Sequence, residues 1–373
     1  MTAHAKLSAS GSARWLACVG SVKAEAHIAN TTSVFAIEGT TAHALADICL
    51  NDASITPQHY VGQSIDGFPV DDEMADHVAA YIAYVKSFKG IPFYEVRVDF
   101  SEWIPDGFGT SDAIVIDEKH KTIHVIDLKY GKGLLVDAEN NSQGMLYALG
   151  AFAAYDFIYD IDNVVIHIYQ PRIKNYSSWS ITIADLLKWA EWAKQRAELA
   201  LSDDAPRTPS DKACQWCKAK ATCKALLDHT HKIIMNDFDE LDNIKPDTLT
   251  DAELRVILDN AKLIKSWLDA VESHVFDTLN RGQAFEGYKL VAGRSTRSWI
   301  NEDAAAKVLS EKLTASELFT QKLISPTQAE KLLKTDKTIL LDLISKGEGK
   351  PTLVPSCDKR IALNNANVFD KLD

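Results

Sequence analysis

The chain has 373 residues, of which 46% are hydrophobic, and a formal net charge of −12 at pH 7. A chain of this size can bury a full core, and its length predicts two or three domains. The negative balance excludes a global basic field for nucleic acid, although a local group of Lys and Arg can still bind phosphates.

The chain contains no apolar run of about 18 residues, so no transmembrane helix is expected. Its first residues, MTAHAKLSASGSARWLACVG, lack the basic segment and apolar core of a secretory signal. We therefore expect a cytoplasmic protein without a membrane partner. In a reducing compartment, clustered cysteines are expected to bind metal or act in redox chemistry rather than form disulfides.

Helical and extended patterns alternate along residues 36–200. The first helix is predicted to start at Gly39 or Thr40, and EKHK is predicted to form a hairpin turn between two strands. In chain order we predict helices at residues 38–50 and 71–89, strands at 93–100, 110–117 and 122–129, a helix at 142–155, strands at 163–172 and 178–183, and a helix at 184–201. This order predicts an α/β domain with a mixed sheet.

A polar, proline-containing linker at residues 202–211 leads from this domain to a cysteine-rich segment. A long helix at residues 251–282 and a small α+β region follow. We expect one domain over residues 1–228 and a C-terminal helical and α+β region of unknown role over residues 229–373.

Two adjacent predicted strands carry acids that point to a metal site. Side chains alternate along a strand, so Asp127 and Lys129 face the same side, and the hairpin can bring Asp112 beside Asp127. Two converging carboxylates suit Mg²⁺ or Mn²⁺, and a nearby ammonium can orient water and stabilise charge on a phosphate. This set fits phosphodiester hydrolysis. The alternative is that these charges face solvent, but both acids lie in apolar strands, where unpaired burial is costly.

The order EGTTAH, GTSDAIVI, VIDLKYGKG and NSQGMLYALG resembles the PD-(D/E)XK nuclease superfamily, in particular its RecB/AddB-type branch. The resemblance covers roughly residues 10–225. It implies a restriction-endonuclease-like α/β fold, with a mixed sheet flanked by helices, and a Mg²⁺- or Mn²⁺-dependent deoxyribonuclease. An exonuclease of phage DNA recombination or processing is the activity it favours.

The resemblance also assigns residues. It implies that His43, Asp112 and Asp127 bind the metal, and that Asp112, Asp127 and Lys129 are catalytic. Gln143 and Tyr147 match a Q-x-x-x-Y pair that, in the family, lies beside the active site and contacts DNA. The second acid is Asp where many relatives have Glu, and both types occur in the superfamily.

Two further residues have open interpretations. Glu95 is either another acid near the metal or a surface residue at a strand edge. Arg172 either lines a path for DNA or lies on a solvated face.

The cysteines Cys214, Cys217 and Cys223 follow a C-x2-C-x5-C spacing, which lacks one ligand of an ordinary four-ligand zinc site. His229 or His231 could complete a zinc site, and Cys18 is the competing ligand. One early cysteine followed by this late spacing resembles the iron–sulfur nucleases of the AddB type and the CRISPR-adaptation exonucleases.

That second resemblance implies a [4Fe–4S] cluster held by the thiolates of Cys18, Cys214, Cys217 and Cys223. The cluster would clasp together two ends of the nuclease domain, which lie roughly 200 residues apart and so close a long loop. Its expected role is structural, since nothing in the sequence indicates electron transfer.

The stretches LSASGSARWLACVGS and GKPTLVPSCDKR resemble a family of phage-encoded proteins of unknown function. This resemblance implies the host cytoplasm as the location. It favours DNA as partner, together with a phage recombination or single-strand-binding protein. The rival interpretation is a non-catalytic DNA-binding or assembly protein that keeps the nuclease fold. The intact set of two acids and a lysine argues against it.

Overall fold

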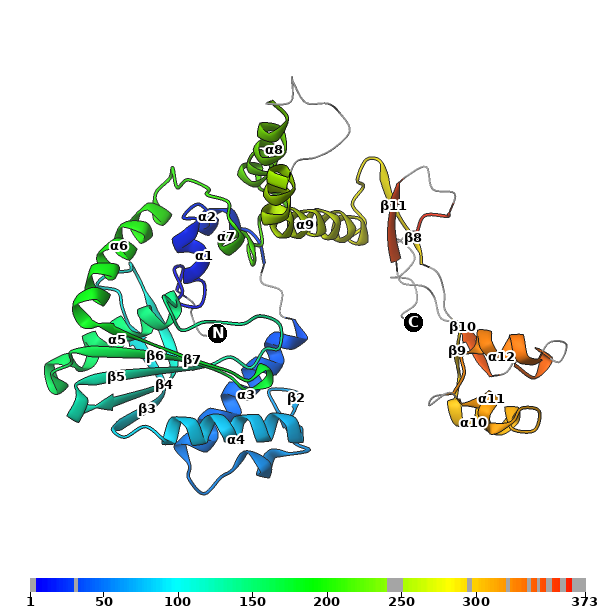
Figure 1. The fold of residues 1–373 in the computed structure, drawn as a ribbon, viewed down its shortest axis with the longest axis horizontal. Coiled ribbons are helices and arrows are strands. Elements are labelled where there is room, and N and C mark those ends of the chain that lie inside the picture. Colours follow the sequence, from blue (N-terminus) through cyan, green and yellow to red (C-terminus); the bar gives the residue numbers. More distant parts are fainter. Residues whose placement is uncertain are drawn as a thin grey trace, which may run out of the picture. The chain divides into compact units, whose positions relative to one another are not determined.

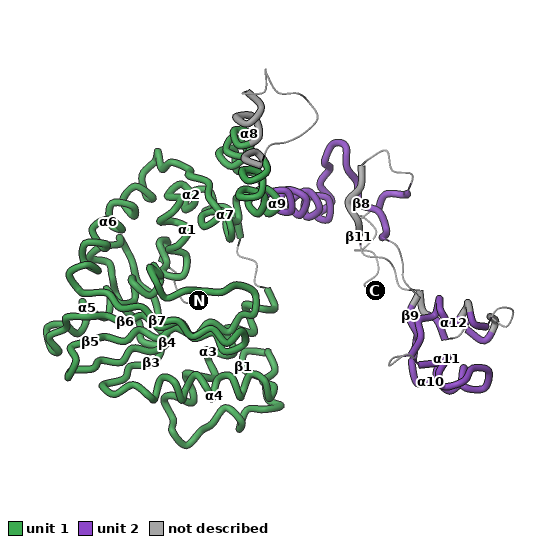
Figure 2. Tube along the Cα trace, in the orientation of Figure 1, with its two compact units in different colours: residues 1–266 green, residues 267–373 purple. Residues whose placement is uncertain are grey.

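The computed structural model describes residues 5–29, 33–239, 251–293, 297–319, 323–333, 337–340, 343–346, 351–355 and 360–363. The chain divides into two compact units, residues 1–266 and residues 267–373 (Figure 2). The functional boundary expected after residue 228 stays a prediction.

A five-stranded mixed sheet forms the centre of the first unit (Figure 1). Its strands are β3 (Ile91–Asp99), β4 (Phe108–Asp117), β5 (Thr122–Leu128), β6 (Asn163–Gln170) and β7 (Asn175–Thr182). They lie in the order β3-β4-β5-β6-β7, with β5 and β6 parallel and the other neighbours antiparallel. A parallel pair needs a crossover connection, and a helix between β5 and β6 supplies it. The mixed α/β sheet predicted from the sequence is therefore confirmed.

The described helices of this unit include the four predicted from the sequence, in the predicted order, and four others. They are α1 (Ser12–Ala17), α2 (Ser21–Glu25), α3 (Val34–Asn51), α4 (Asp72–Lys86), α5 (Ser142–Tyr159), α6 (Ile183–Leu201), α7 (Asp211–Cys214) and α8 (Lys224–Asp239). The long α9 (Asp251–Asn280) follows. The 3₁₀ turns are η1 (Pro57–Tyr60), η2 (Glu118–His120), η3 (Pro171–Ile173) and η4 (Lys220–Thr222), and a small hairpin pairs β1 (Ser64–Ile65) with β2 (Phe68–Pro69).

One helix start was predicted wrongly. Helix α3 begins at Val34, because the Ser33 side chain accepts a hydrogen bond from the backbone N–H of Ala36 and caps the first turn. Gly39 and Thr40 lie inside the helix. The observed helix therefore has an extra turn on the N-terminal side of the segment that contains His43.

Two hydrophobic clusters cover the two faces of the sheet. One joins the sheet to α5 and α6, and the other joins it to α3 and α4. Helix α5 lies very close to the strands: a Cβ at Gly144 would be 2.5 Å from Ile166 Cγ2, and one at Gly150 would be 2.7 Å from Val98 Cβ. Glycine at these positions fixes the height of α5 above the sheet.

The side-chain alternation expected of a regular strand breaks at Glu95 in β3. Phe93 and Val96 both pack on the cluster that contains α5, whereas Tyr94 packs on the opposite one. Glu95 has a φ of 44°, in the left-handed region that non-glycine residues rarely adopt. The alternation restarts after this residue, so Glu95 does not share a face with Phe93 and Arg97 as it would in a regular strand.

The second unit contains short antiparallel strand pairs and small helices. β8 (Tyr288–Ala292) pairs with β11 (Pro351–Pro355), and β9 (Arg297–Trp299) pairs with β10 (Ile344–Lys346). The helices are α10 (Glu302–Leu309), α11 (Ala315–Leu318), α12 (Pro326–Leu333) and the 3₁₀ turn η6 (Lys337–Leu340). A small core of its own, around Leu309 and Leu340, holds the helices together. Across the described parts of the chain, no helix combines the length and apolarity needed to cross a membrane.

Candidate functional site

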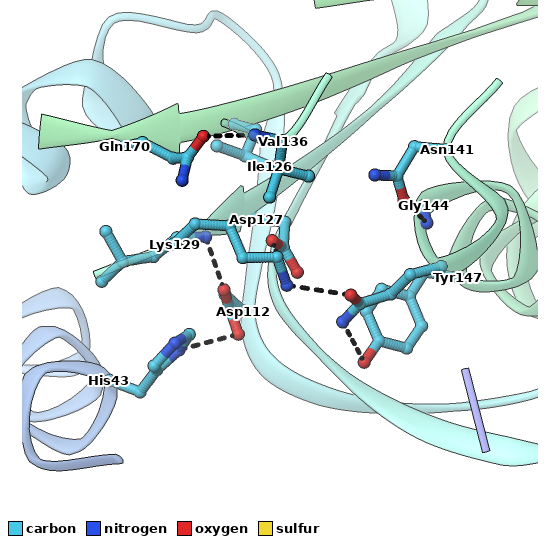
Figure 3. A network of polar contacts seen from close by, with 12 residues as sticks. His43, Asp112, Ile126, Asp127, Lys129, Val136, Asn141, Gly144, Tyr147 and Gln170 are labelled. Atoms are coloured by element: carbon cyan, nitrogen blue, oxygen red, sulfur yellow. Dashed lines mark hydrogen bonds and ion pairs between the residues drawn. The ribbon is translucent and has the colours of Figure 1, made fainter. Parts of the chain in front are cut away.

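The predicted acids converge where β4 and β5 separate (Figure 3). The β4–β5 ladder extends to Ala113 paired with Ile126, so Asp112 and Asp127 are the next residues on the two strands. At this point the Asp112 side chain enters the sheet: its Oδ2 accepts a hydrogen bond of 2.7 Å from the backbone N–H of Leu128. This contact holds one carboxylate oxygen in place and leaves the other for α3.

Helix α3 supplies the histidine that the sequence analysis assigns to the metal. His43 Nδ1 lies 3.1 Å from Asp112 Oδ1. Ligand atoms of His43, Glu95 and Asp112 all lie within 4.8 Å of one another. One nitrogen and two carboxylate oxygens form a donor set that suits Mn²⁺ or Mg²⁺. The structure thus brings together two of the predicted metal ligands and adds Glu95 to them.

The left-handed backbone of Glu95 places this acid at the site. Tyr94 pairs with Ala113 and Val96 with Ser111, so Glu95 stands opposite Asp112 in the β3–β4 register. A left-handed non-glycine residue costs on the order of 1–3 kcal/mol and persists where the surrounding structure imposes it. Residues of this kind gather at functional sites, and this one lies beside the metal-ligand candidates.

Asp127 pairs with the predicted catalytic lysine. Asp127 is 3% exposed, and its Oδ2 lies 2.8 Å from the Lys129 ammonium. The pair meets the distance of a hydrogen bond but not its angles, so Oδ2 is a buried acceptor without a hydrogen bond. The ammonium still offsets the buried carboxylate charge, whose unpaired burial would be costly. Asp127 lies outside the three-residue ligand group and faces it from the next strand.

Lys129 is oriented by the Q-x-x-x-Y pair on α5. Its ammonium donates a hydrogen bond of 2.8 Å to Gln143 Oε1, and Gln143 Nε2 donates one of 3.1 Å to the Tyr147 hydroxyl (Figure 3). The Tyr147 ring lies on Gly109, where a Cβ would be 2.8 Å from its Cε1 atom. Gly109 is the first residue of the GTSDAIVI stretch, and its lack of a side chain leaves room for the tyrosine ring.

Three ionisable side chains of the site hold their protons more tightly than usual. Burial lowers the pKa of His43, but the carboxylates of Asp112 and Asp127 outweigh burial and raise it to about 9. Burial, followed by the charge of Asp112, raises the pKa of Glu95 to about 7. Burial also raises the pKa of Asp127, despite the opposing charge of Lys129. Protons are therefore held tightly at positions where a divalent cation could replace them.

A cleft of about 760 Å³ opens beside the site. Its walls come from the start of α3, the loop after β5, the end of β6 and the cysteine segment. His43 and Lys129 lie at one part of this lining. The cleft is the space through which a substrate can reach the predicted catalytic residues.

Arg172, expected either on a DNA path or on a solvated face, is part of the cleft wall. Its side chain is 9% exposed, and its guanidinium binds Glu38 at 2.8 Å and Glu73 at 3.3 Å. It also lies over the Tyr130 ring, 4.7 Å from the ring centroid. These contacts tie η3 to α3 and α4, so Arg172 braces the cleft.

Gln170, which was not predicted from the sequence, holds the loop after Lys129. Gln170 is 2% exposed; its Oε1 accepts from the Val136 N–H at 2.8 Å, and its Nε2 donates to the Leu134 carbonyl at 2.9 Å. A polar residue at the end of an apolar strand, just before Pro171, was the available signal. It fixes the shape of one cleft wall (Figure 3).

The four predicted cluster cysteines line one small cavity. Cys18 comes from the end of α1, and Cys214, Cys217 and Cys223 come from the segment after the linker. Burial raises the pKa of the Cys214 thiol, and it raises that of Cys217 to about 11. Among the residues that the structure describes, no three of these sulfur atoms lie mutually within 4.8 Å. The cysteines thus share a cavity without forming a tight single-ion site.

The histidines of the alternative zinc site do not line that cavity. His229 is partly exposed and His231 is exposed on α8.

Comparison with known proteins gives one family and a distant structural likeness. A family model described as "Protein of unknown function (DUF2800)" matches residues 4–361. A solved structure described as "Crystal structure of SSO0001" has 15% sequence identity and a TM-score of 0.27, and the match covers 58% of this chain and 85% of that chain. Neither the family description nor this distant likeness assigns a function to the chain.

Proposed function

We propose that this chain, which belongs to the DUF2800 family of proteins of unknown function, is a metal-dependent DNA nuclease with a restriction-endonuclease-like fold. The observation that carries the proposal is the convergence of His43, Glu95 and Asp112 beside the buried Asp127–Lys129 pair. A metal-ligand group next to a positioned ammonium is the set that phosphodiester hydrolysis requires. We infer exonuclease action in phage DNA recombination or processing, in the host cytoplasm.

Some of these residues would bind the metal, and others would stabilise charge. His43, Glu95 and Asp112 would hold Mn²⁺ or Mg²⁺, with Asp127 as the neighbouring acid. When bound, such a cation lowers the pKa of a coordinated water and polarises a phosphoryl oxygen. Lys129 is placed to orient the water and to stabilise charge on the phosphate, because Gln143 holds its ammonium at 2.8 Å.

A second metal group is proposed for the cysteine cavity. A single Zn²⁺ with Zn–S bonds of about 2.3 Å would hold its sulfur atoms about 3.8 Å apart. The described cysteines form no such group, although all four line the same cavity. A multi-iron cluster spaces its thiolates more widely than one ion does. What supports our proposal of a [4Fe–4S] cluster held by Cys18, Cys214, Cys217 and Cys223, with a structural role, is that all four thiols line this one cavity.

The proposal predicts that wild-type protein degrades linear DNA with Mn²⁺ or Mg²⁺ and stops when EDTA is added. End-labelled single- and double-stranded DNA would show the polarity and strand preference of the cleavage. Salt-sensitive DNA binding with no cleavage under any of these metal conditions would contradict the proposal and support a non-catalytic assembly protein instead. A phage recombination or single-strand-binding protein remains the proposed protein partner.

The raised pKa values predict that Mn²⁺ stabilises the protein more at higher pH. Glu95 has a folded pKa of about 7 against an ordinary 4.5, and His43 has about 9 against 6.5. Between the ordinary and the folded pKa of each group, the folded protein therefore binds more protons than the unfolded one. Its stability falls as the pH rises from about 4.5 to 7 for Glu95 and from about 6.5 to 9 for His43. A bound cation takes the place of those protons, so the destabilisation should vanish with metal.

Thermal melts with and without Mn²⁺ check this. The increase in Tm on adding Mn²⁺ should be small at about pH 6 and clearly larger at about pH 9. His43→Ala should flatten this trend, because it removes the group that releases its proton at the highest pH. An increment in wild-type protein that is constant or shrinks with pH would count against metal binding at this site.

A further inference from the structure

Two exposed aromatic side chains line the cleft that contains His43 and Lys129. Phe35, in the first turn of α3, is 80% exposed, and Trp216, between Cys214 and Cys217, is 68% exposed. Phenylalanine is among the most frequently buried residues, and tryptophan is highly buried on average. Single exposed apolar residues are ordinary, but here two aromatic rings from distant parts of the sequence border one cleft.

The backbone that carries Trp216 is fixed, although its ring is free of the core. The Trp216 carbonyl accepts a hydrogen bond of 3.2 Å from Arg14 Nη1, and Arg14 pairs with Glu25 at 3.0 Å. Glu25 Oε1 in turn accepts from the Lys218 N–H at 2.6 Å. A ring presented on an anchored backbone can stack on a ligand at a small cost in entropy.

The charges of the same cleft suit a phosphate backbone. Lys129 and Lys132 both line it, and the Lys132 side chain is 55% exposed. Lys132 binds Glu73 at 3.0 Å, an exposed ion pair of the kind that contributes little stability and can exchange its partner. Aromatic faces for bases and ammonium groups for phosphates together are the features of a single-strand binding groove.

We propose that Trp216 and Phe35 stack on unpaired bases, so that this site takes single-stranded DNA or the unpaired end of a duplex. In duplex DNA each base face is covered by its neighbours, and an aromatic ring can stack only on a base that has left the helix. The inference rests on the proposed function, because a strand held by these rings would present its backbone to the metal site. The proposed substrate class is DNA whose base faces are not covered by neighbouring bases.

The proposal also connects the cysteine cavity with the substrate. Trp216 lies between two of the cysteines that line that cavity, and its carbonyl is bound to α1 through Arg14. The contacts that anchor this segment to α1 and α2 therefore set the position of the Trp216 backbone. The cysteine segment closes the nuclease domain and at the same time supplies one wall of the substrate cleft.

The test measures binding rather than cleavage. Wild-type and variant proteins are titrated, with Ca²⁺ in place of Mn²⁺, with fluorescein-labelled oligothymidylate, an abasic oligomer of equal length and a blunt duplex. A gel checks that the DNA stays intact. Trp216→Ala should weaken oligothymidylate binding roughly 10- to 100-fold and change abasic and duplex binding little, as the loss of one or two stacked bases requires. Phe35→Ala should show the same selectivity.

The matched control is Trp192→Ala, which removes another exposed tryptophan, 45% exposed on α6 and not part of this cleft. It should leave binding to all three ligands unchanged. Equal affinity of wild type and both cleft variants for oligothymidylate would overturn the proposal. An equal loss on oligothymidylate and the abasic oligomer would also overturn it, because the rings would then not act on bases.

The outcome is separable from that of the proposed function. If wild-type protein cleaves no DNA but shows base-dependent binding that needs Trp216, the nuclease proposal fails and the stacking inference stands. If it cleaves DNA and binds abasic DNA as tightly as oligothymidylate, the stacking inference fails and the nuclease proposal stands.

Discussion

Replacing Lys129 by alanine is expected to lower the rate of Mn²⁺-dependent DNA cleavage at saturating DNA roughly 10³-fold. Loss of one preorganised charge donor at a transition state costs on this order in kcat. The structure gives the reason: the Lys129 ammonium lies between Asp127 Oδ2 and Gln143 Oε1, at 2.8 Å from each, and so is fixed beside the metal-ligand group. Initial rates on end-labelled DNA at saturating Mn²⁺ measure the effect.

The control for this variant is Lys188→Ala on α6, which removes a lysine that is 77% exposed and paired with Asp185. Its cleavage rate should match that of the wild type. Gln143→Ala should fall between the two, because it leaves the lysine charge and removes one contact that orients it. Full activity of the Lys129 variant would show that this lysine takes no part in the mechanism.

Replacing Cys18 by alanine is expected to remove the metal from the cysteine cavity and to destabilise the whole first unit. A cross-link that closes a loop of roughly 200 residues stabilises a fold by about 5 kcal/mol in the chain-entropy model. Cys18 lies against the linker as well, since its Sγ accepts a hydrogen bond of 3.2 Å from the Thr208 N–H. Anaerobically purified wild type should be brown, with iron and sulfide; the variant should be colourless, with a lower Tm.

The matched control is Cys49→Ala, which removes a cysteine that is 1% exposed in the core between α3 and α4. It should lower stability by the cost of a small core cavity, about 1 kcal/mol, and leave the iron content unchanged. A full iron complement in the Cys18 variant would contradict the proposed ligand set. Stoichiometric zinc in colourless wild-type protein would contradict the iron–sulfur assignment itself.

The fold and part of the site were predictable because they depend on local patterns. The change from helical to alternating periodicity gave the order of the elements around the sheet. Alternation placed Asp127 and Lys129 on one side of β5, and the hairpin brought Asp112 beside them. These relations follow from the geometry of a single strand or hairpin.

Other parts depend on contacts between distant segments. The role of Glu95 comes from a left-handed backbone conformation that interrupts the alternation of β3. The residue type does not predict that conformation. Ser33 sets the start of α3, although Gly39 and Thr40 looked like better start signals. The position of Trp216 in the cleft depends on Arg14, which lies roughly 200 residues earlier in the chain and is a contact that no periodicity encodes.

The central claim is that His43, Glu95 and Asp112 bind a divalent cation that the chain uses to hydrolyse DNA. Asp112→Asn tests it most directly, since this change keeps the size of the side chain and removes its charge. The decisive measurement is the release of label from end-labelled linear DNA as Mn²⁺ is titrated, with wild type and variant side by side. The account predicts Mn²⁺-dependent release by the wild type and none by the variant. Equal release by both proteins would contradict it.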